Sequence, residues 1–304
     1  MKNKALHLII GLIMMAIFTG CCEKQETEVR KGNYRIVDNA IVFDEPQRVE
    51  GQKSVLQFTV DPIENVRIGY IGLGMRGYDA VDRITYIDGV TIVALCDIEP
   101  DRVEAVQTDI LEARGLPRAA AYTGREGWRE LCERDDIDLV YICTNWQTHV
   151  EMAVYAMQQG KHVALEVPAA TSIEDCWKLV DVAEQTQRHC MMLENCCYDF
   201  FENCCYDFFE LTALNMAQQG MFGELVHGEG AYIHNLEPFW REYYENWRLE
   251  FNQNHAGDVY PTHGLGPLCQ AFNIHRGDRM KTLAHRVRNS HTRRQSVRIR
   301  GTAW

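Results

Sequence analysis

The chain has 304 residues, of which 46% are hydrophobic and 24% are charged, a composition typical of a globular protein with room for two modest domains. Its formal net charge of -12 argues against nucleic acid as a partner, because phosphates attract basic surfaces. The twelve cysteines form no CxxC pair, and Cys96, Cys132, Cys143 and Cys190 lie in or beside apolar segments. We therefore expect structural thiols and no metal site.

Residues 1–21 predict an export signal. Lys2 and Lys4 precede an apolar core at 5–18 that is too short to span a bilayer comfortably, and the core ends in small residues before Cys21. The pattern resembles a bacterial lipoprotein signal, in which Cys21 is lipidated and becomes the mature N-terminus. The alternative is an ordinary cleaved signal peptide. We expect an exported, lipid-anchored protein on the periplasmic side of a bacterial membrane or at the cell surface.

Residues 22–65 are mixed and polar, and they predict a tether with an added N-terminal segment and one strand at 54–60. From residue 66 onward strands and helices alternate, which predicts an α/β fold with a parallel sheet covered on both faces. We expect strands at 66–71, 90–96, 137–143, 162–166 and 190–193, a short segment at 119–122, and helices at 78–85, 100–114, 126–133 and 150–159. Residues 66–193 are thus predicted to form a Rossmann dinucleotide-binding domain.

The stretch VRIGYIGLGMRG at 66–77 combines a strand, a tight turn and the start of a helix. Gly72 permits the turn, Gly74 lets a pyrophosphate approach the backbone, and Gly77 lets the helix pack closely. The second strand ends in Asp97, whose carboxylate suits a ribose 2′-hydroxyl and would repel a 2′-phosphate. This context predicts an NAD site, although a glycine-rich turn between packed elements is the alternative.

Ligands of open α/β sheets gather at the carboxyl ends of the strands. The strand ending at 143 is followed by Trp146 and His149, and the next strand ends at Glu166 and Val167. We expect these four residues near the nicotinamide half of the cofactor. By spacing alone His149 would have a packing role at a helix start.

The motifs GLGMRG, ALCD, CTNWQTH, HVALEVPAA, MMLENCCYDFFE and VYPTHG resemble those of bacterial glycoside hydrolase family 109, the NAD-dependent α-N-acetylgalactosaminidases of the wider Gfo/Idh/MocA oxidoreductase superfamily. The resemblance covers residues 66–278. Ordinary dehydrogenases of that superfamily carry Glu-Lys-Pro where this chain has Glu166-Val167-Pro168. Since valine cannot carry a proton, the ordinary dehydrogenase chemistry loses its main acid/base group.

The resemblance implies two sets of site residues. The residues assigned to NAD are Met75, Arg76, Asp97, Trp146, Gln147, Thr148, His149, Glu166, Val167, Asn195 and Tyr260. Those assigned to the sugar are Tyr232, Arg248, Tyr260, Pro261, Thr262 and His263. By spacing alone, Tyr232 could face a core or a cleft within the alternating segment 226–234, and Arg248 could form a surface ion pair. Tyr260 and His263 are three residues apart at the start of a predicted helix, so they could share one face.

The octapeptide ENCCYDFF occurs twice, at 194–201 and 202–209, where a family member would carry it once. The first copy follows a predicted strand, and the second leads into a predicted helix at 209–218. We assign the cofactor contact to Asn195 because the upstream strand fixes its position, and Asn203 is the alternative.

The last segment, 279–304, contains eight Lys or Arg and no Asp or Glu, whereas residues 1–278 contain 23 basic and 43 acidic residues. So abrupt a change favours a shifted reading frame, and a basic tail for anionic surfaces is the alternative. We therefore expect residues 194–278 to form an incomplete α+β substrate domain, followed by an anomalous basic tail, in a poorly active protein.

The resemblance implies a glycosidase that releases terminal α-linked N-acetylgalactosamine from glycans by NAD-assisted oxidation, elimination, water addition and re-reduction. Tyr260 and His263 are the candidates for proton transfer. The alternatives are an NAD(P)-dependent sugar dehydrogenase and a non-catalytic, lipid-anchored sugar-binding protein.

Overall fold

The computed structural model describes residues 29–31, 34–37, 40–43, 46–194, 208–233, 247–255, 260–274, 277–278, 280, 282–286 and 296–300. They divide into two compact units, one of residues 46–279 and one that combines residues 1–45 with 280–304. Predictions at Cys21, at Asn195 and at Asn203 fall outside the described residues, as does the part of the copied octapeptide at 195–207.

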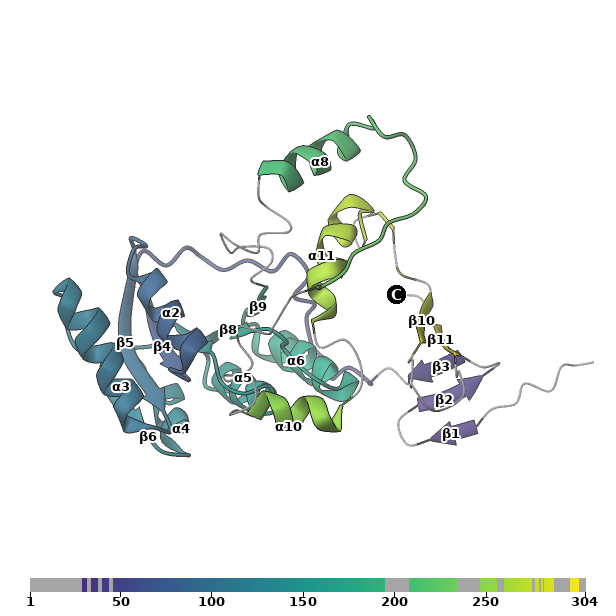
Figure 1. Cartoon of the computed structure of the whole chain (residues 1–304). Helices are drawn as coiled ribbons and strands as arrows, with labels where there is room; N and C mark the ends of the chain where they lie inside the picture. The colour runs from purple at the N-terminus through teal and green to yellow at the C-terminus, as the bar shows by residue number, and fades with distance from the viewer. Residues whose placement is uncertain are drawn as a thin grey trace, which may run out of the picture. The chain divides into compact units, whose positions relative to one another are not determined.

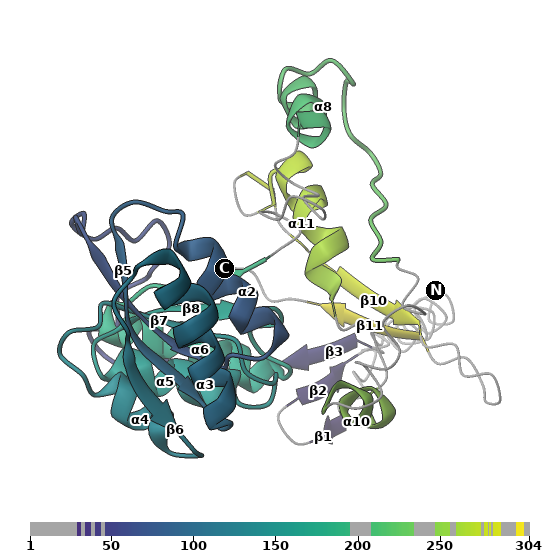
Figure 2. The same cartoon turned by 60° about the vertical axis from the view of Figure 1, so that its left-hand side comes forward.

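The unit of residues 46–279 contains a six-stranded parallel sheet. Its strands are β4 (Val66–Ile71), β5 (Val90–Asp97), β6 (Ala120–Thr123), β7 (Leu139–Ile142), β8 (His162–Glu166) and β9 (Cys190–Leu193). Their order is β6-β5-β4-β7-β8-β9, with every neighbouring pair parallel. Figure 1 labels five of these strands and Figure 2 labels β7. The order reverses between β4 and β7, as in dinucleotide-binding folds, so the predicted Rossmann domain is confirmed.

Helices cover both faces of this sheet because adjacent strand residues point to opposite sides. The helices are α2 (Met75–Ile84), α3 (Pro100–Val106), α4 (Gly127–Cys132), α5 (His149–Gln158) and α6 (Ile173–Thr186). One core joins α2 and α3 to strand residues such as Tyr70 and Leu95. The other joins α4, α5 and α6 to the neighbouring residues Ile71, Ala94 and Cys96. The predicted elements of this domain are confirmed within a few residues.

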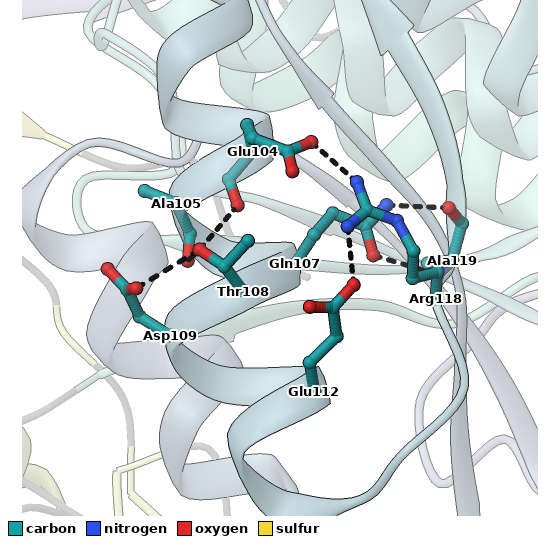
Figure 3. A network of polar contacts seen from close by, with 8 residues as sticks. All are labelled: Glu104, Ala105, Gln107, Thr108, Asp109, Glu112, Arg118 and Ala119. Atoms are coloured by element: carbon teal, nitrogen blue, oxygen red, sulfur yellow. Dashed lines mark hydrogen bonds and ion pairs between the residues drawn. The ribbon is translucent and has the colours of Figure 1, made fainter.

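The predicted helix at 100–114 is continuous but changes its winding. Helix α3 passes into the π-helix η1 (Gln107–Leu111) and the 3-10 turn η2 (Glu112–Arg114). Figure 3 shows the contacts that fix it to the chain before β6: the buried Gln107 amide donates to the Ala119 carbonyl oxygen at 2.6 Å and accepts from the Ala119 N–H at 3.0 Å. Arg118 pairs with Glu104 and Glu112 at the surface. This anchoring fixes the segment that follows Asp97.

The strand predicted at 54–60 is wrong, since this stretch contains turns and no strand. Val55 packs against the core beneath α6, while Leu56 is 86% exposed. Polar contacts hold the preceding residues: Arg48 lies 2.8 Å from a carboxylate oxygen of the buried Glu184, and Gln52 donates to the same oxygen at 2.8 Å. The segment therefore lies along α6, where it finds no strand to pair with.

The rest of this unit is helical or extended in its described residues, with one isolated β-bridge among them, between Ile274 and Asp278. It contains α8 (Phe208–Gln218), α10 (Trp247–Asn254) and α11 (Pro261–Ala271), which confirms the helices predicted at 209–218 and after Tyr260. Residues 226–233 form no strand, contrary to the alternation there. They lie against α11 instead: a Cβ added at Gly230 would stand 2.3 Å from the Gly264 carbonyl oxygen.

The other unit contains a five-stranded sheet in the order β1-β2-β3-β11-β10. Its strands are β1 (Val29–Lys31), β2 (Tyr34–Val37), β3 (Ala40–Phe43), β10 (Thr282–Arg286) and β11 (Ser296–Arg300). Strand β11 pairs with β3 in parallel and with β10 in antiparallel register (Figure 2). The basic segment after 279 thus supplies two strands of a sheet.

The cysteines that the structure describes are free thiols, and the four predicted as structural are buried or half-buried. Burial raises the pKa of Cys96, Cys132 and Cys190 to about 12, so these thiols stay protonated and unreactive at neutral pH. Among the described helices, none combines the length and the apolar character that crossing a bilayer requires.

Candidate active site

The turn between β4 and α2 is shaped by three glycines with different surroundings. Gly72 adopts φ of 89°, which side chains rarely tolerate. A Cβ added at Gly77 would stand 1.9 Å from the Gly72 carbonyl oxygen, whereas a Cβ at Gly74 would meet only the Arg102 guanidinium, at 3.9 Å. Gly72 and Gly77 therefore serve the turn and the helix packing, and the backbone at Gly74 is open to a ligand.

Asp97 ends β5 and is 5% exposed. Its carboxylate accepts from the Leu73 N–H at 2.6 Å and from the Glu99 N–H at 2.9 Å. Arg102, one turn into α3, lies 3.4 Å from the same group. Asp97 thus ties the glycine turn to the end of β5. Oδ1 accepts from both Glu99 and Arg102, whereas Oδ2 accepts only from Leu73 among the described residues and keeps a second lone pair for a further donor. Sequence reasoning missed Arg102, although a basic residue one turn into the helix after the acidic strand end is a visible signal.

Glu166, at the end of β8, is the centre of a buried polar cluster. Arg76 Nε lies 3.0 Å from one of its oxygens, and the Tyr141 hydroxyl donates to the other at 2.9 Å. Burial, and then the negative charge of Glu166, raises the pKa of Tyr141 far above its usual value, so this phenol remains a donor. The structure therefore brings together two predicted residues, Arg76 and Glu166, with Tyr141, which sequence reasoning missed.

His149 opens α5 with its ring fully buried. Nδ1 lies 2.9 Å from the Pro168 carbonyl oxygen and Nε2 lies 3.1 Å from the Thr144 carbonyl oxygen. Burial lowers the pKa of His149, against the raising effect of the two carbonyls. The ring joins the loops after β7 and β8, so contact between His149 and a cofactor would have to come through its backbone.

The other predicted cofactor residues differ in exposure. Met75 is 62% exposed and Val167 is 8% exposed, and Gln147 faces solvent. The Thr148 hydroxyl donates to the Thr144 hydroxyl oxygen at 2.8 Å, which closes the loop after β7. The valine at 167 is therefore an apolar, buried group, as expected from the sequence.

Trp146 lies at the carboxyl edge of the sheet and is 3% exposed because aromatic residues from the second half of the unit cover it. Trp247, Phe251 and Tyr260 each meet its ring edge-on, with centroids 4.8, 4.9 and 5.6 Å away. The Arg248 guanidinium lies 5.9 Å from the same ring. These contacts attach α10 and the start of α11 to the Rossmann domain.

The predicted sugar residues continue this cluster. The rings of Tyr260 and His263 are 5.1 Å apart, which confirms that they share one face, and the Tyr232 ring meets His263 edge-on at 4.6 Å. The close approach of Gly230 to Gly264 brings Tyr232 to this position. Pro261 is exposed, and the Thr262 hydroxyl is buried without a hydrogen-bond partner among the described residues.

His263 also meets a residue that sequence reasoning missed. Its Nδ1 lies 2.9 Å from Oε1 of Glu194, with side chains that are 4% and 8% exposed. Glu194 follows β9 directly, just as Glu166 ends β8. An acidic residue directly after a predicted strand of the parallel sheet was the signal that could have found it.

Comparison with known families gives two matches, one for each of two successive parts of the chain. Residues 66–194 match the oxidoreductase family with an NAD-binding Rossmann fold. Residues 206–302 match the C-terminal domain of glycosyl hydrolase 109. The second match extends through the basic segment that contains β10 and β11.

Individual relatives give the same result. Glycosyl hydrolase family 109 protein 1 of Bacteroides thetaiotaomicron is 54% identical over 284 residues, which cover 93% of this chain and 57% of that protein. An alpha-N-acetylgalactosaminidase of Bacteroides fragilis is 52% identical over 242 residues, covering 78% of this chain and 55% of that protein. The chain spans about half the length of the curated relatives it matches.

Among solved structures, a putative oxidoreductase from Klebsiella pneumoniae superposes with a TM-score of 0.51. It is 17% identical, and the superposition covers 79% of this chain and 62% of that one. At this identity the likeness concerns the fold alone.

Proposed function

Because this chain belongs to glycosyl hydrolase family 109, we propose that it releases terminal α-linked N-acetylgalactosamine from glycans with the help of bound NAD. The supporting observation is the convergence of Tyr232, Arg248, Tyr260 and His263 beside Trp146, at the carboxyl edge of the sheet. This is the edge at which open α/β sheets bind their ligands. The name of the Bacteroides fragilis relative supports the choice of sugar.

The residues present fit NAD. The backbone at Gly74 is open, and α2 begins at Met75 with its N–H groups and positive dipole end beside it. Asp97 offers a carboxylate to a ribose hydroxyl and would repel a 2′-phosphate, so NAD should bind better than NADP. We infer the following set for the cofactor: Gly72, Gly74, Met75, Arg76, Asp97, Trp146, Gln147, Thr148, His149, Glu166, Val167, Asn195 and Tyr260.

The sugar side of the site offers an aromatic face and donors. Tyr232 and Tyr260, whose rings are 5.1 Å apart, supply flat apolar surface for the sugar ring, and Arg248 supplies guanidinium donors for its oxygens. The buried Thr262 hydroxyl has no hydrogen-bond partner among the described residues, so it is a further polar group that a ligand could satisfy. These residues would orient the sugar against the strand ends.

When bound, NAD would supply a transient oxidation of the sugar at C3 and a final return of the hydride to C3, and the oxidation would acidify the C2 proton so that the C1 substituent can leave. Tyr260 and His263 are the proposed carriers of the protons that leave and return. Because the buried Val167 cannot carry a proton, other residues would have to take the proton of the C3 hydroxyl when C3 is oxidised. Paired carboxylates are not needed, since NAD-dependent glycosidases depart from that scheme.

The test is cleavage of p-nitrophenyl α-N-acetylgalactosaminide in heavy water. We expect nitrophenol to be released slowly, as the incomplete substrate domain expected from the sequence implies, without a matching amount of NADH and with deuterium entering at C2 of the sugar. A fully protonated C2 would rule out the elimination. NADH that accumulates in step with substrate would instead indicate a sugar dehydrogenase, and glycan binding without turnover would indicate a binding protein.

We also propose export and lipid anchoring through Cys21, on the sequence pattern of residues 1–21. The adjacent Cys22 provides a matched control. In a bacterial host labelled with palmitate, Cys21→Ser should lose the label and the membrane association, and Cys22→Ser should keep both. Equal labelling of the Cys21→Ser variant would refute the lipid anchor.

A further inference from the structure

The contact between Glu194 and His263 joins two distant parts of the chain. Glu194 follows β9 at the carboxyl edge of the sheet, and His263 lies in the first turn of α11. Both side chains are more than nine-tenths buried, and Nδ1 of His263 is 2.9 Å from Oε1 of Glu194. Burying a carboxylate is costly unless donors or positive charge accompany it. The contact is therefore more than a surface ion pair.

The pair has the arrangement of a carboxylate that orients a histidine. A carboxylate that accepts from Nδ1–H fixes one tautomer of the imidazole and leaves the lone pair on Nε2. The distance is already short, but Nδ1 does not yet meet hydrogen-bond geometry with a described residue. Hydrogen bonds in active sites are often misaligned without ligand and tighten when it binds.

The surroundings make the orientation of this ring consequential. Tyr232 and Tyr260 meet the imidazole at 4.6 and 5.1 Å, so His263 is held between the carboxylate and the rings assigned to the sugar. A rotation of the imidazole would move the only ring nitrogen left for the substrate.

We propose that Glu194 is a positioning residue that holds His263 in the Nδ1–H tautomer. Nε2 then accepts a proton from the sugar, the carboxylate stabilises the imidazolium that forms, and the same proton balance is restored when Nε2 gives a proton back. This proposal rests on the proposed function for the role of His263 in proton transfer. The tautomer itself can be measured without any activity.

The copied octapeptide supplies a matched control. Glu194 and Glu202 are the first residues of the two identical copies. Glu194→Gln removes the charge at nearly constant size, and Glu202→Gln makes the same change in the same local sequence. Glu194→Asp keeps the charge and shortens its reach.

The first measurement is nitrogen NMR of the protein with labelled histidine, in which the His263 signals are assigned by their loss in His263→Asn. We expect the Nδ1–H tautomer in the unmodified protein and in Glu202→Gln, and a mixture of tautomers in Glu194→Gln. An Nε2–H tautomer in the unmodified protein, or the same change in Glu202→Gln, would overturn the proposal.

The second measurement is turnover of p-nitrophenyl α-N-acetylgalactosaminide beside NAD titration. Glu194→Gln should lower kcat about 100-fold with KM within about threefold, retain NAD binding, and be partly rescued by Glu194→Asp. A normal kcat in Glu194→Gln would refute the positioning role. If His263 has the expected tautomer but the protein cleaves no substrate, the interaction between Glu194 and His263 is supported and the proposed function is refuted. If Glu194→Gln loses NAD binding through misfolding, Glu194→Asp carries the comparison. Its shorter reach should lower kcat while NAD binding is kept, and a kcat equal to that of the unmodified protein would refute the role.

Discussion

Replacing Gly77 with alanine should destabilise the Rossmann domain, and replacing Gly74 should not. A Cβ at position 77 would lie 1.9 Å from the Gly72 carbonyl oxygen, 2.8 Å from the Gly72 carbonyl carbon and 3.3 Å from the Cys143 Cβ. Two of these neighbours are backbone atoms in a buried turn, so α2 must move away from β4. Overpacking of this kind costs about 3 kcal/mol, the upper end of the usual range. For a unit of this size that lowers Tm by roughly 6–12 °C.

Gly74→Ala is the matched comparison, because its Cβ would meet only the end of the Arg102 side chain at 3.9 Å. We expect its Tm to stay within about 1 °C of the unmodified protein. If a pyrophosphate approaches this backbone, NAD affinity should fall at least about tenfold, or 1.4 kcal/mol. The assays are thermal denaturation and NAD titration by calorimetry. An unchanged Tm in Gly77→Ala, or unchanged NAD affinity in Gly74→Ala, would refute the division of roles between the two glycines.

Three further predictions concern the sheet and its edge. Hydrogen bonds from Arg67 are the main cause that holds the pKa of Asp138 below its ordinary value of 3.8, so the pair stabilises the protein above that value and ceases to do so as the pH falls through the depressed pKa. Asp138→Asn should therefore have a lower Tm than the unmodified protein at neutral pH, and the two Tm values should converge in acid. A difference in Tm that is the same at both pH values would contradict this. Trp146→Ala should lower the free energy of unfolding by about 3–5 kcal/mol, which a lower urea midpoint would show. An unchanged midpoint would mean that the aromatic residues around Trp146 contribute little to stability. Tyr141→Phe removes a donor to Glu166 and should cost about 1.5–3 kcal/mol; equal stability in the same urea titration would show that water replaces the hydroxyl.

Much of the Rossmann domain could be predicted because its local signals agree with one another. Strands β8 and β9 have the predicted bounds, 162–166 and 190–193, since polar residues at or beside their ends bound the apolar stretches sharply. The segment at 54–60 misled the prediction because strand propensity says nothing about a partner. Val55 packs against the core, the Phe58 ring lies 4.8 Å from that of His189, and the other residues of the segment are exposed. A strand needs a neighbour that the local sequence does not reveal.

The candidate site was predictable where chain order and strand ends define it, and the remainder was not. Tyr260 and His263 follow from helical spacing, but the packing of Tyr232 on them depends on the approach of two glycines from separate segments. The Glu194 contact has the same origin, because a distant helix supplies its partner. Contacts between remote segments carry no periodicity, so the sequence alone does not indicate them.

The rings of Trp146 and Trp247 are nearly perpendicular, and their centroids are 4.8 Å apart. The intrinsic tryptophan fluorescence of the protein therefore reports on this contact. Two indoles so close exchange excitation energy, and Trp146 emits from a nearly dry environment only while α10 and Tyr260 cover it. Any separation of α10 from the strand end would admit water to that ring and shift its emission to longer wavelength. Intrinsic fluorescence can thus follow the attachment of the substrate-side helices in real time, without a label.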